Sequence, residues 1–305
     1  MSTDHAIRLT HVTKSFSGHR AVKDLSLTVP RGSVFGMLGP NGAGKTTTLR
    51  MVMDILAPDT GTIEILGAPA GSASRDRVGY MPEERGLYPR MVLEEQLLFM
   101  AEIKGTRRSE ATHRLAAWLE RLGLGEWRKR RVNELSKGMQ QKAQFIATVL
   151  HDPEVLILDE PMSGLDPVGT DLMRDVFVDM RRDGKTLVLS SHQMETVERL
   201  CDAIALIHNG EKLLDGTVAE VKRRYGKNSV VLAFDGDGGF LAGLPGVARV
   251  SDFGRHVEVR LDDGADPQAL LREATARLHL SRFEIMEPSL HEIFVDQVAP
   301  KGDAA

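Results

Sequence analysis

The stretch Gly39-Pro40-Asn41-Gly42-Ala43-Gly44-Lys45-Thr46 decides the fold, because it fits the phosphate-binding loop pattern G-x-x-x-x-G-K-[ST]. Glycines in such a loop let backbone N–H groups turn inward around a phosphate chain, and the helix that follows presents its positive N-terminal end. The lysine side chain reaches the β- and γ-phosphates, and the threonine hydroxyl is a ligand for Mg²⁺. The predicted phosphate contacts are Gly39, Asn41, Gly42, Ala43, Gly44, Lys45, Thr46 and Thr47.

The neighbouring residues give this loop the context that it requires. Val34–Leu38 is a short apolar run typical of a strand, and residues 47–55 are compatible with a helix. Strands and helices alternate again over residues 155–208, which favours a mainly parallel sheet with helices on its faces.

A second apolar run ends in two carboxylates. Val155–Leu158 predicts a buried strand, and Asp159 and Glu160 follow it directly. Such a strand brings Asp159 to the carboxyl edge of the sheet, where ligands of α/β proteins bind. One acid there can hold the metal, and a second can deprotonate a water. Alone, the pattern equally fits a buried strand before an acidic helix cap; beside a phosphate loop, it favours Asp159 as metal ligand and Glu160 as general base.

The full set of motifs resembles the ATP-binding subunits of ABC transporters. Leu135–Gln140 is similar to the family's LSGGQ signature, with departures at Lys137 and Met139, and its serine lies 23 residues before Asp159. Ser163–Asp166 resembles the D-loop. His192 resembles the switch histidine, 33 residues after Asp159, and Phe16 stands where the family stacks an aromatic side chain on adenine.

The resemblance implies a head-to-tail dimer that closes on two ATP molecules. Ser136 and the N–H of Gly138 would contact the γ-phosphate from the partner subunit, at a helix N-terminus. Glu160 would activate the attacking water, His192 would sense the γ-phosphate, and Asp166 would help to couple the two sites. The implied cofactors are ATP and Mg²⁺.

One position departs from the family pattern. Where the family has a glutamine that touches Mg²⁺ and the membrane subunit, this chain has Glu83. Glutamate is also an oxygen donor, so we expect Thr46, Glu83 and Asp159 to hold the metal. The alternative is that Glu83 points into solvent.

Two further segments resemble the sodium- and drug-exporter (NatA-like) branch of the family. They are Pro82–Pro89 and Ser289–Phe294. In that branch the membrane-spanning permease is a separate polypeptide, which the resemblance places against the segment from Glu83 to about Lys104. The chain is then expected at the cytoplasmic face of the cell membrane as a peripheral protein.

Composition bounds the remaining possibilities. The 305 residues are 42% hydrophobic and 27% charged, with a net charge of −4 and a single cysteine, Cys201. This balance fits a globular protein without an internal disulfide and disfavours a nucleic-acid partner. The chain has no apolar run long enough to span a membrane. The basic run Arg128–Arg131 fits a solvated face better than a lipid contact.

The expected fold class is α/β: a phosphate-loop ABC ATPase domain with a mainly parallel sheet core, an antiparallel β portion and a helical subdomain, plus a small C-terminal α+β domain. Its expected bounds are 1–218 for the ATPase domain, with the helical subdomain at about 84–150, then 219–300 for the accessory domain and 301–305 for a tail. Within the helical part, Ser109 is the predicted N-cap of a helix. We expect the accessory domain to regulate or strengthen dimer contacts.

Two functions remain open from the sequence. The first is an ATPase subunit that powers export of an unknown substrate through a separate permease. The alternative is a soluble ABC ATPase that acts in macromolecular assembly, but such relatives carry either two ATPase domains or a long coiled coil, and neither is present in this sequence. A kinase or GTPase would leave Leu135–Gln140 unexplained.

Overall fold

The computed structural model describes residues 5–71, 76–225, 229–262, 264–286 and 288–298, so the expected tail 301–305 lies outside the described residues. The chain divides into two compact units, residues 1–216 and 217–305.

A six-stranded sheet forms the centre of the first unit. Its order is β10 (Glu211–Thr217), β9 (Ala203–His208), β3 (Val34–Leu38), β8 (Thr186–Ser191), β7 (Val155–Asp159) and β6 (Val78–Met81). Strands β9, β3, β8, β7 and β6 run parallel, and the register pairs Leu38 with Ser191 and Asp159 with Ser190. The residues that follow β3, β7 and β8 therefore meet at one edge of the sheet.

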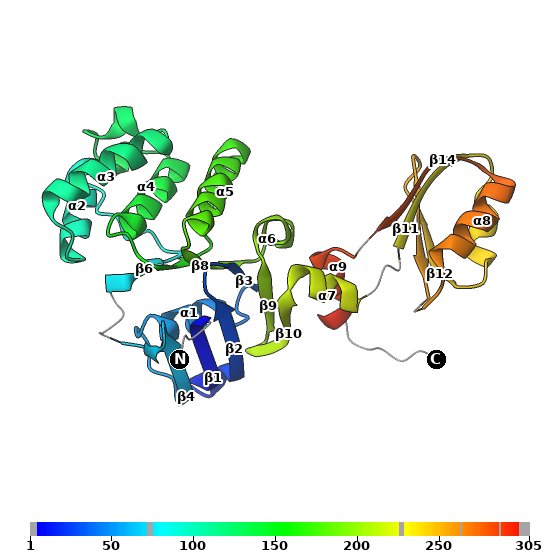
Figure 1. Cartoon of the computed structure of the whole chain (residues 1–305), viewed down its shortest axis with the longest axis horizontal. Coiled ribbons are helices and arrows are strands. Elements are labelled where there is room, and N and C mark those ends of the chain that lie inside the picture. The colour runs from blue at the N-terminus through cyan, green and yellow to red at the C-terminus, as the bar shows by residue number, and fades with distance from the viewer. Residues whose placement is uncertain (1–4, 72–75, 226–228, 263, 287, 299–305) are drawn as a thin grey trace. The chain divides into compact units, whose positions relative to one another are not determined.

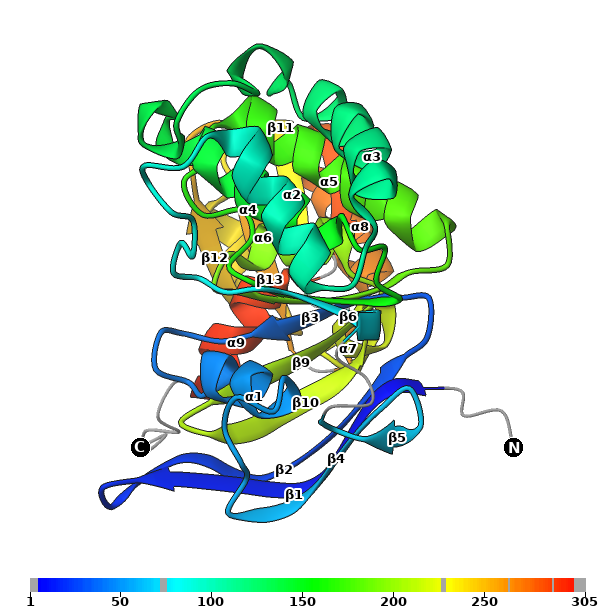
Figure 2. The same cartoon turned by 90° about the vertical axis from the view of Figure 1, so that its left-hand side faces the viewer.

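A four-stranded antiparallel sheet packs against this one. Its order is β2 (His19–Pro30), β1 (His5–Phe16), β4 (Thr60–Ile65) and β5 (Ala68–Pro69). Helix α1 (Lys45–Val52) lies between the two sheets, as Figure 2 shows. Its buried side chains, such as Leu49 and Met51, share one apolar core with both sheets.

Three helices form a group beyond the central sheet (Figure 1). They are α2 (Leu93–Ile103), α3 (Arg108–Arg121) and α4 (Lys137–Val149), with 3₁₀ turns at Gly125–Trp127 and Val132–Glu134. The Phe145 ring of α4 packs against Trp118 of α3 and against Phe177 of α5 (Pro167–Arg182), with centroid separations of 5.8 and 5.5 Å. Helix α6 (Met194–Leu200) follows β8.

One predicted helix boundary was wrong. Helix α3 has Arg107 at its N-cap, without a side-chain hydrogen bond, and Ser109 lies inside the first turn. The helix starts earlier because Ala111, Leu115 and Leu119 bury one face, and this packing outweighs the modest gain from a serine cap.

The second unit begins with α7 (Val218–Arg224) and continues as β11 (Ser229–Asp235), a 3₁₀ turn (Gly239–Gly243), β12 (Val247–Asp252), β13 (Val257–Leu261), α8 (Pro267–Arg277), β14 (His279–Met286) and α9 (Leu290–Val298). The sheet order is β12-β13-β11-β14, all antiparallel. Ser289 and Glu292 exchange backbone-to-side-chain hydrogen bonds at the start of α9 and so form a capping box there.

The α/β fold class is confirmed, with a mainly parallel core, an antiparallel sheet and a helical portion. Across the described ranges, no helix combines the length and the apolar character that crossing a bilayer requires.

Candidate phosphate-binding site

The loop between β3 and α1 has a backbone that only glycine adopts easily. Gly39 and Gly44 have φ angles of +151° and +104°, and Gly44 is the N-cap of α1. A Cβ atom would lie 2.1 Å from the Ile207 carbonyl oxygen at Gly39 and 2.4 Å from that of Ala21 at Gly44. Both positions therefore exclude any side chain, and the loop wraps tightly onto its neighbours.

The Lys45 ammonium is buried at the bottom of this loop, with the residue only 6% exposed. It donates hydrogen bonds to the carbonyl oxygens of Gly39 at 2.7 Å and Pro40 at 3.1 Å. Burial lowers the pKa of Lys45, and the carboxylates of Glu160, Asp159 and Glu83 oppose this shift. The ammonium thus faces three acidic side chains, and a polyanion bound there would offset its burial further.

A hydroxyl from the neighbouring strand links the Asp159 carboxylate, at the end of β7, to the backbone of Glu160, the next residue. Ser190 donates its hydroxyl hydrogen to Oδ1 of Asp159 and accepts the backbone N–H of Glu160 at 3.1 Å. Asp159 is 1% exposed, and its Oδ2 is a buried acceptor with no hydrogen-bond partner among the described residues. A buried acceptor without a partner is costly, so Oδ2 is suited to a donor or a cation that enters the site.

Glu160 is held in an uncommon conformation. Its φ of +49° lies in the left-handed region, which costs a residue with a side chain of the order of 1 kcal/mol or more. Its carboxylate Oε1 lies 2.9 Å from Nδ1 of His192, and the Glu160 residue is 9% exposed. The strained backbone aims the carboxylate at the site, where the imidazole pairs with it.

A cavity of about 360 Å³ brings most of the predicted residues together. Its lining includes Ala21 and these predicted site residues: Asn41, Gly42, Ala43, Gly44, Lys45, Thr46, Thr47, Glu83, Asp159 and Glu160. Glu83 is exposed and faces this cavity, so the lining contains carboxylates from β7 and from the segment after β6.

Other predicted residues lie outside the cavity lining. Ser136 caps α4 by accepting the N–H of Met139 at 3.2 Å, and Asp166 caps α5 by accepting the N–H of Gly169 at 2.9 Å. A Cβ on Gly138 would lie 3.2 Å from the Gly164 carbonyl oxygen. The signature-like and D-loop-like segments thus pack against each other within one chain.

Phe16 also lies apart from the cavity lining. Its side chain is exposed, and the Lys14 ammonium lies 5.7 Å from its ring centroid. Gly39 and His192 likewise do not line the cavity, although each contacts a residue that does.

Sequence reasoning missed Ala21 and Ser190. Ala21 comes from β2, far from the loop in sequence, and no local motif marks it. Ser190 lies near the end of β8, and the alternation of strands and helices predicted over residues 155–208 was the one available signal, because the ends of parallel strands meet at one edge.

Side chains alone do not form a metal cage in the described part of the chain, since no group of three or more histidine, cysteine, aspartate or glutamate residues there is placed to hold an ion. Mg²⁺ is usually bound by one or two carboxylates together with substrate phosphates and waters.

Comparison with known proteins gives the family. A profile described as "ABC transporter" matches residues 22–163, and one described as "ATP-binding protein DrrA1-3-like, C-terminal domain" matches residues 216–298. A solved structure titled "Structure of ATP binding subunit of ABC transporter" has a TM-score of 0.68 at 30% identity and covers 72% of this chain and 93% of its own.

Two relatives match this chain over almost its full length. The uncharacterized ABC transporter ATP-binding protein YhaQ of Bacillus subtilis (strain 168) is 40% identical, over 96% of this chain and 98% of its own. The Nod factor export ATP-binding protein I of Rhizobium sp. (strain N33) is 34% identical, over 95% and 96%. With its phosphate loop, its acidic strand end and these relatives, the chain belongs to the ATP-binding subunits of ABC transporters, which are ATPases, and it carries a DrrA-like C-terminal domain.

Proposed function

We propose that this chain hydrolyses ATP as a head-to-tail dimer and powers export through a separate membrane permease. The observation that carries the proposal is the cavity in which the phosphate loop faces the carboxylates of Asp159 and Glu160. The export role draws support from the similarity, over 95% of this chain, to a Nod factor export ATP-binding protein.

Within the site, the phosphate loop binds the β- and γ-phosphates, and Lys45 neutralises part of their charge. Glu160 is the general base that accepts a proton from the attacking water. His192, 2.9 Å from the Glu160 carboxylate, orients that base and responds to the γ-phosphate. Phe16 stacks on the adenine ring from the exposed end of β1.

The residues present fit Mg²⁺. Asp159 Oδ2 is a buried oxygen that lacks a partner, and the hydroxyl-bearing Thr46 and the carboxylate-bearing Glu83 line the same cavity. Oxygen donors of this kind are those that Mg²⁺ prefers. When bound, the ion neutralises charge on the phosphate oxygens. These three side chains hold and orient it.

The dimer completes each site from the partner copy. Ser136 and Gly138 stand at the N-terminal end of α4, which favours an anionic ligand such as a γ-phosphate. Asp166, at the start of α5 beside them, links the two sites. These residues lie outside the cavity lining of their own chain, and in the proposed dimer they belong to the site of the partner copy.

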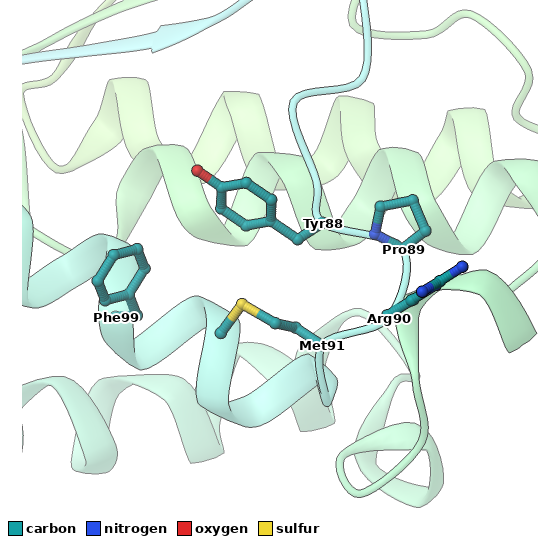
Figure 3. Close-up of a pocket in the computed structure, with 5 residues that line it drawn as sticks. All are labelled: Tyr88, Pro89, Arg90, Met91 and Phe99. Carbon is teal, nitrogen blue, oxygen red and sulfur yellow. The ribbon is translucent and has the colours of Figure 1, made fainter.

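An apolar pocket on the helical portion is the proposed contact for the permease. It has a volume of about 600 Å³ and is lined by Tyr88, Pro89, Arg90, Met91 and Phe99 (Figure 3). The Tyr88 and Phe99 residues are 55% and 43% exposed, and Figure 3 shows Arg90 extending away from the side chains of Tyr88, Met91 and Phe99. Exposed apolar patches of this kind mark interaction sites.

The test uses a tagged Glu160→Gln variant, which we expect to bind ATP but hydrolyse it slowly. It is purified with ATP and Mg²⁺ from detergent-solubilised membranes, and the co-purifying proteins are identified. We expect an integral membrane protein in near-equal amount. Recovery of soluble partners alone, from a preparation that retains other membrane complexes, would favour the assembly-machine alternative.

A matched variant tests the docking pocket. Tyr88→Glu places a charge in the apolar pocket and should remove the membrane protein from the purification, while the ATPase rate of the isolated subunit stays within about twofold, since surface substitutions away from the site change little. Undiminished recovery of the membrane protein would argue against this surface.

A further inference from the structure

One face of helix α4 carries two buried glutamines, with a glycine toward one end of the helix and a threonine toward the other. Gly138, Gln141, Gln144 and Thr148 recur at spacings of three and four, so they lie on the same side of the helix. Gln141 and Gln144 are 2% and 4% exposed. Glutamine is rarely so buried, and a buried amide needs hydrogen-bond partners.

Gln141 holds the residue that carries the proposed general base. Its Nε2 donates to the carbonyl oxygens of Glu160 at 3.2 Å and Pro161 at 3.1 Å. The Ser190 hydroxyl accepts the N–H of Glu160 from the other side. Both ends of this left-handed residue are thereby fixed, and strained residues persist only where their surroundings fix them.

Gln144 holds the second acidic segment in the same way. Its Nε2 donates to the carbonyl oxygens of Pro82 at 2.7 Å and Glu84 at 3.3 Å. These carbonyls flank Glu83, whose carboxylate lines the phosphate cavity. The position of Glu83 therefore depends on the position of α4.

The two ends of α4 are also packed closely. A Cβ on Gly79 of β6 would lie 2.5 Å from the Thr148 carbonyl oxygen, so helix and strand backbones approach each other there. At the other end, Gly138 approaches the Gly164 carbonyl. This face of the helix thus runs from the central sheet to the signature end, with the two amides between these contacts.

We propose that Gln141 and Gln144 are positioning residues through which one helix sets two of the three acidic side chains of the ATP site, those of Glu160 and Glu83. Gln141 fixes Glu160, and Gln144 fixes Glu83. Because both amides stand on the helix that begins at Ser136, a shift of that helix moves the two carboxylates together. The inference rests on the proposed function for the roles of Glu160 and Glu83.

The first test replaces Gln141 by methionine, which has nearly the same length but no donor. We expect kcat to fall on the order of tenfold, because small misplacements of a catalytic group are costly. ATP affinity measured without turnover should stay close to that of the wild type, whereas the thermal midpoint should fall by a few degrees, because a buried carbonyl loses its donor. Combined with Glu160→Gln, the substitution should cause no further loss, since the base is already removed.

Two more variants make this test decisive. Thr148→Val removes a buried hydroxyl from the same helix face. This hydroxyl donates to the carbonyl oxygens of Gln144 and Tyr80 but contacts neither acidic loop. The kcat of the Thr148→Val variant should therefore change less than twofold. Gln141→Asn keeps the amide but shortens its reach, and it should lose activity like the methionine variant. If both Gln141 variants have the same kcat as Thr148→Val, the role of Gln141 is wrong. It is also wrong if Gln141→Met, combined with Glu160→Gln, lowers kcat below that of Glu160→Gln alone.

The second test measures metal binding rather than turnover. Mn²⁺ affinity is followed by electron paramagnetic resonance in the presence of a non-hydrolysable ATP analogue. Gln144→Met and Glu83→Ala should each weaken Mn²⁺ binding on the order of tenfold, as loss of a supporting contact to a metal ligand does. Gln141→Met should leave Mn²⁺ binding unchanged.

The outcomes separate this inference from the function on which it rests. If Glu83→Ala weakens Mn²⁺ binding and Gln144→Met does not, the positioning role of Gln144 is wrong. If Glu83→Ala leaves Mn²⁺ binding unchanged, the metal role proposed for Glu83 is wrong, and the Gln144 half of the inference falls with it. The Gln141 half is then decided by kcat alone.

Discussion

At the scale of single residues, His151 shows how burial sets a pH dependence. Its Nε2 lies 3.3 Å from the Val78 carbonyl oxygen, its Nδ1 has no hydrogen-bond partner among the described residues, and burial lowers its pKa from the ordinary 6.5. As the pH falls, His151 in the unfolded chain therefore takes up a proton at a higher pH than His151 in the native protein does. Stability from the neutral ring is complete above about pH 6.5 and is lost as the pH falls below it.

His151→Gln should remove this dependence. Glutamine keeps a donor for the Val78 carbonyl but does not titrate, so the free energy of unfolding of the variant should fall less between pH 7.5 and pH 5.5. Urea denaturation of both proteins at several pH values measures the difference. Parallel pH profiles would show that His151 does not contribute.

At the scale of elements, helix α5 depends on its N-cap residue, Asp166. Asp166 accepts the Gly169 N–H at 2.9 Å, and Pro167 follows it at the first helical position. Asp166→Ala should cost about 1 kcal/mol of unfolding free energy, the usual value for a lost N-cap. Urea denaturation in the absence of nucleotide checks this.

A conservative variant separates the cap from the proposed coupling role of Asp166. Asp166→Asn keeps a capping oxygen but removes the charge, so stability should be retained while any fall in ATPase rate reports the dimer contact. Equal stability of Asp166→Ala and the wild type would show that the cap is dispensable.

At the scale of the whole molecule, the two units have separate apolar cores. One core joins β-strands and α1 of the first unit, and another joins strands β11 and β13 with α8 of the second. A chain ending at Gly216 should therefore remain folded and bind ATP, as far-ultraviolet circular dichroism and equilibrium dialysis would show. An unfolded product would mean that the first unit needs the second.

The same truncation tests our proposal that the second unit regulates or strengthens dimer contacts. In the Glu160→Gln background, the shortened chain should form less ATP-dependent dimer than the full chain at equal concentration, measured by sedimentation. Two results together would contradict this role. Truncation would leave dimer formation unchanged in the Glu160→Gln background, and it would leave the ATPase rate unchanged in the chain that retains Glu160.

The sequence by itself determined the elements whose signals are local. Val34–Leu38 is a strand with the predicted bounds, because a continuous apolar run between polar turns is fixed by neighbours along the chain. The phosphate loop and the two acids after β7 were found in the same way, from spacing that the chemistry requires. The roles of Phe16 and the other predicted site residues stay predictions.

Only the tertiary structure decided what depends on contacts between distant segments. The hydroxyl of Ser190 joins Asp159 to Glu160 because β7 and β8 pair in one register. Gln141 and Gln144 look like surface residues in the sequence, yet they are buried because α4 packs across the carbonyls of two loops. Burial and hydrogen-bond partners arise from packing across the chain, so no local pattern could have given them.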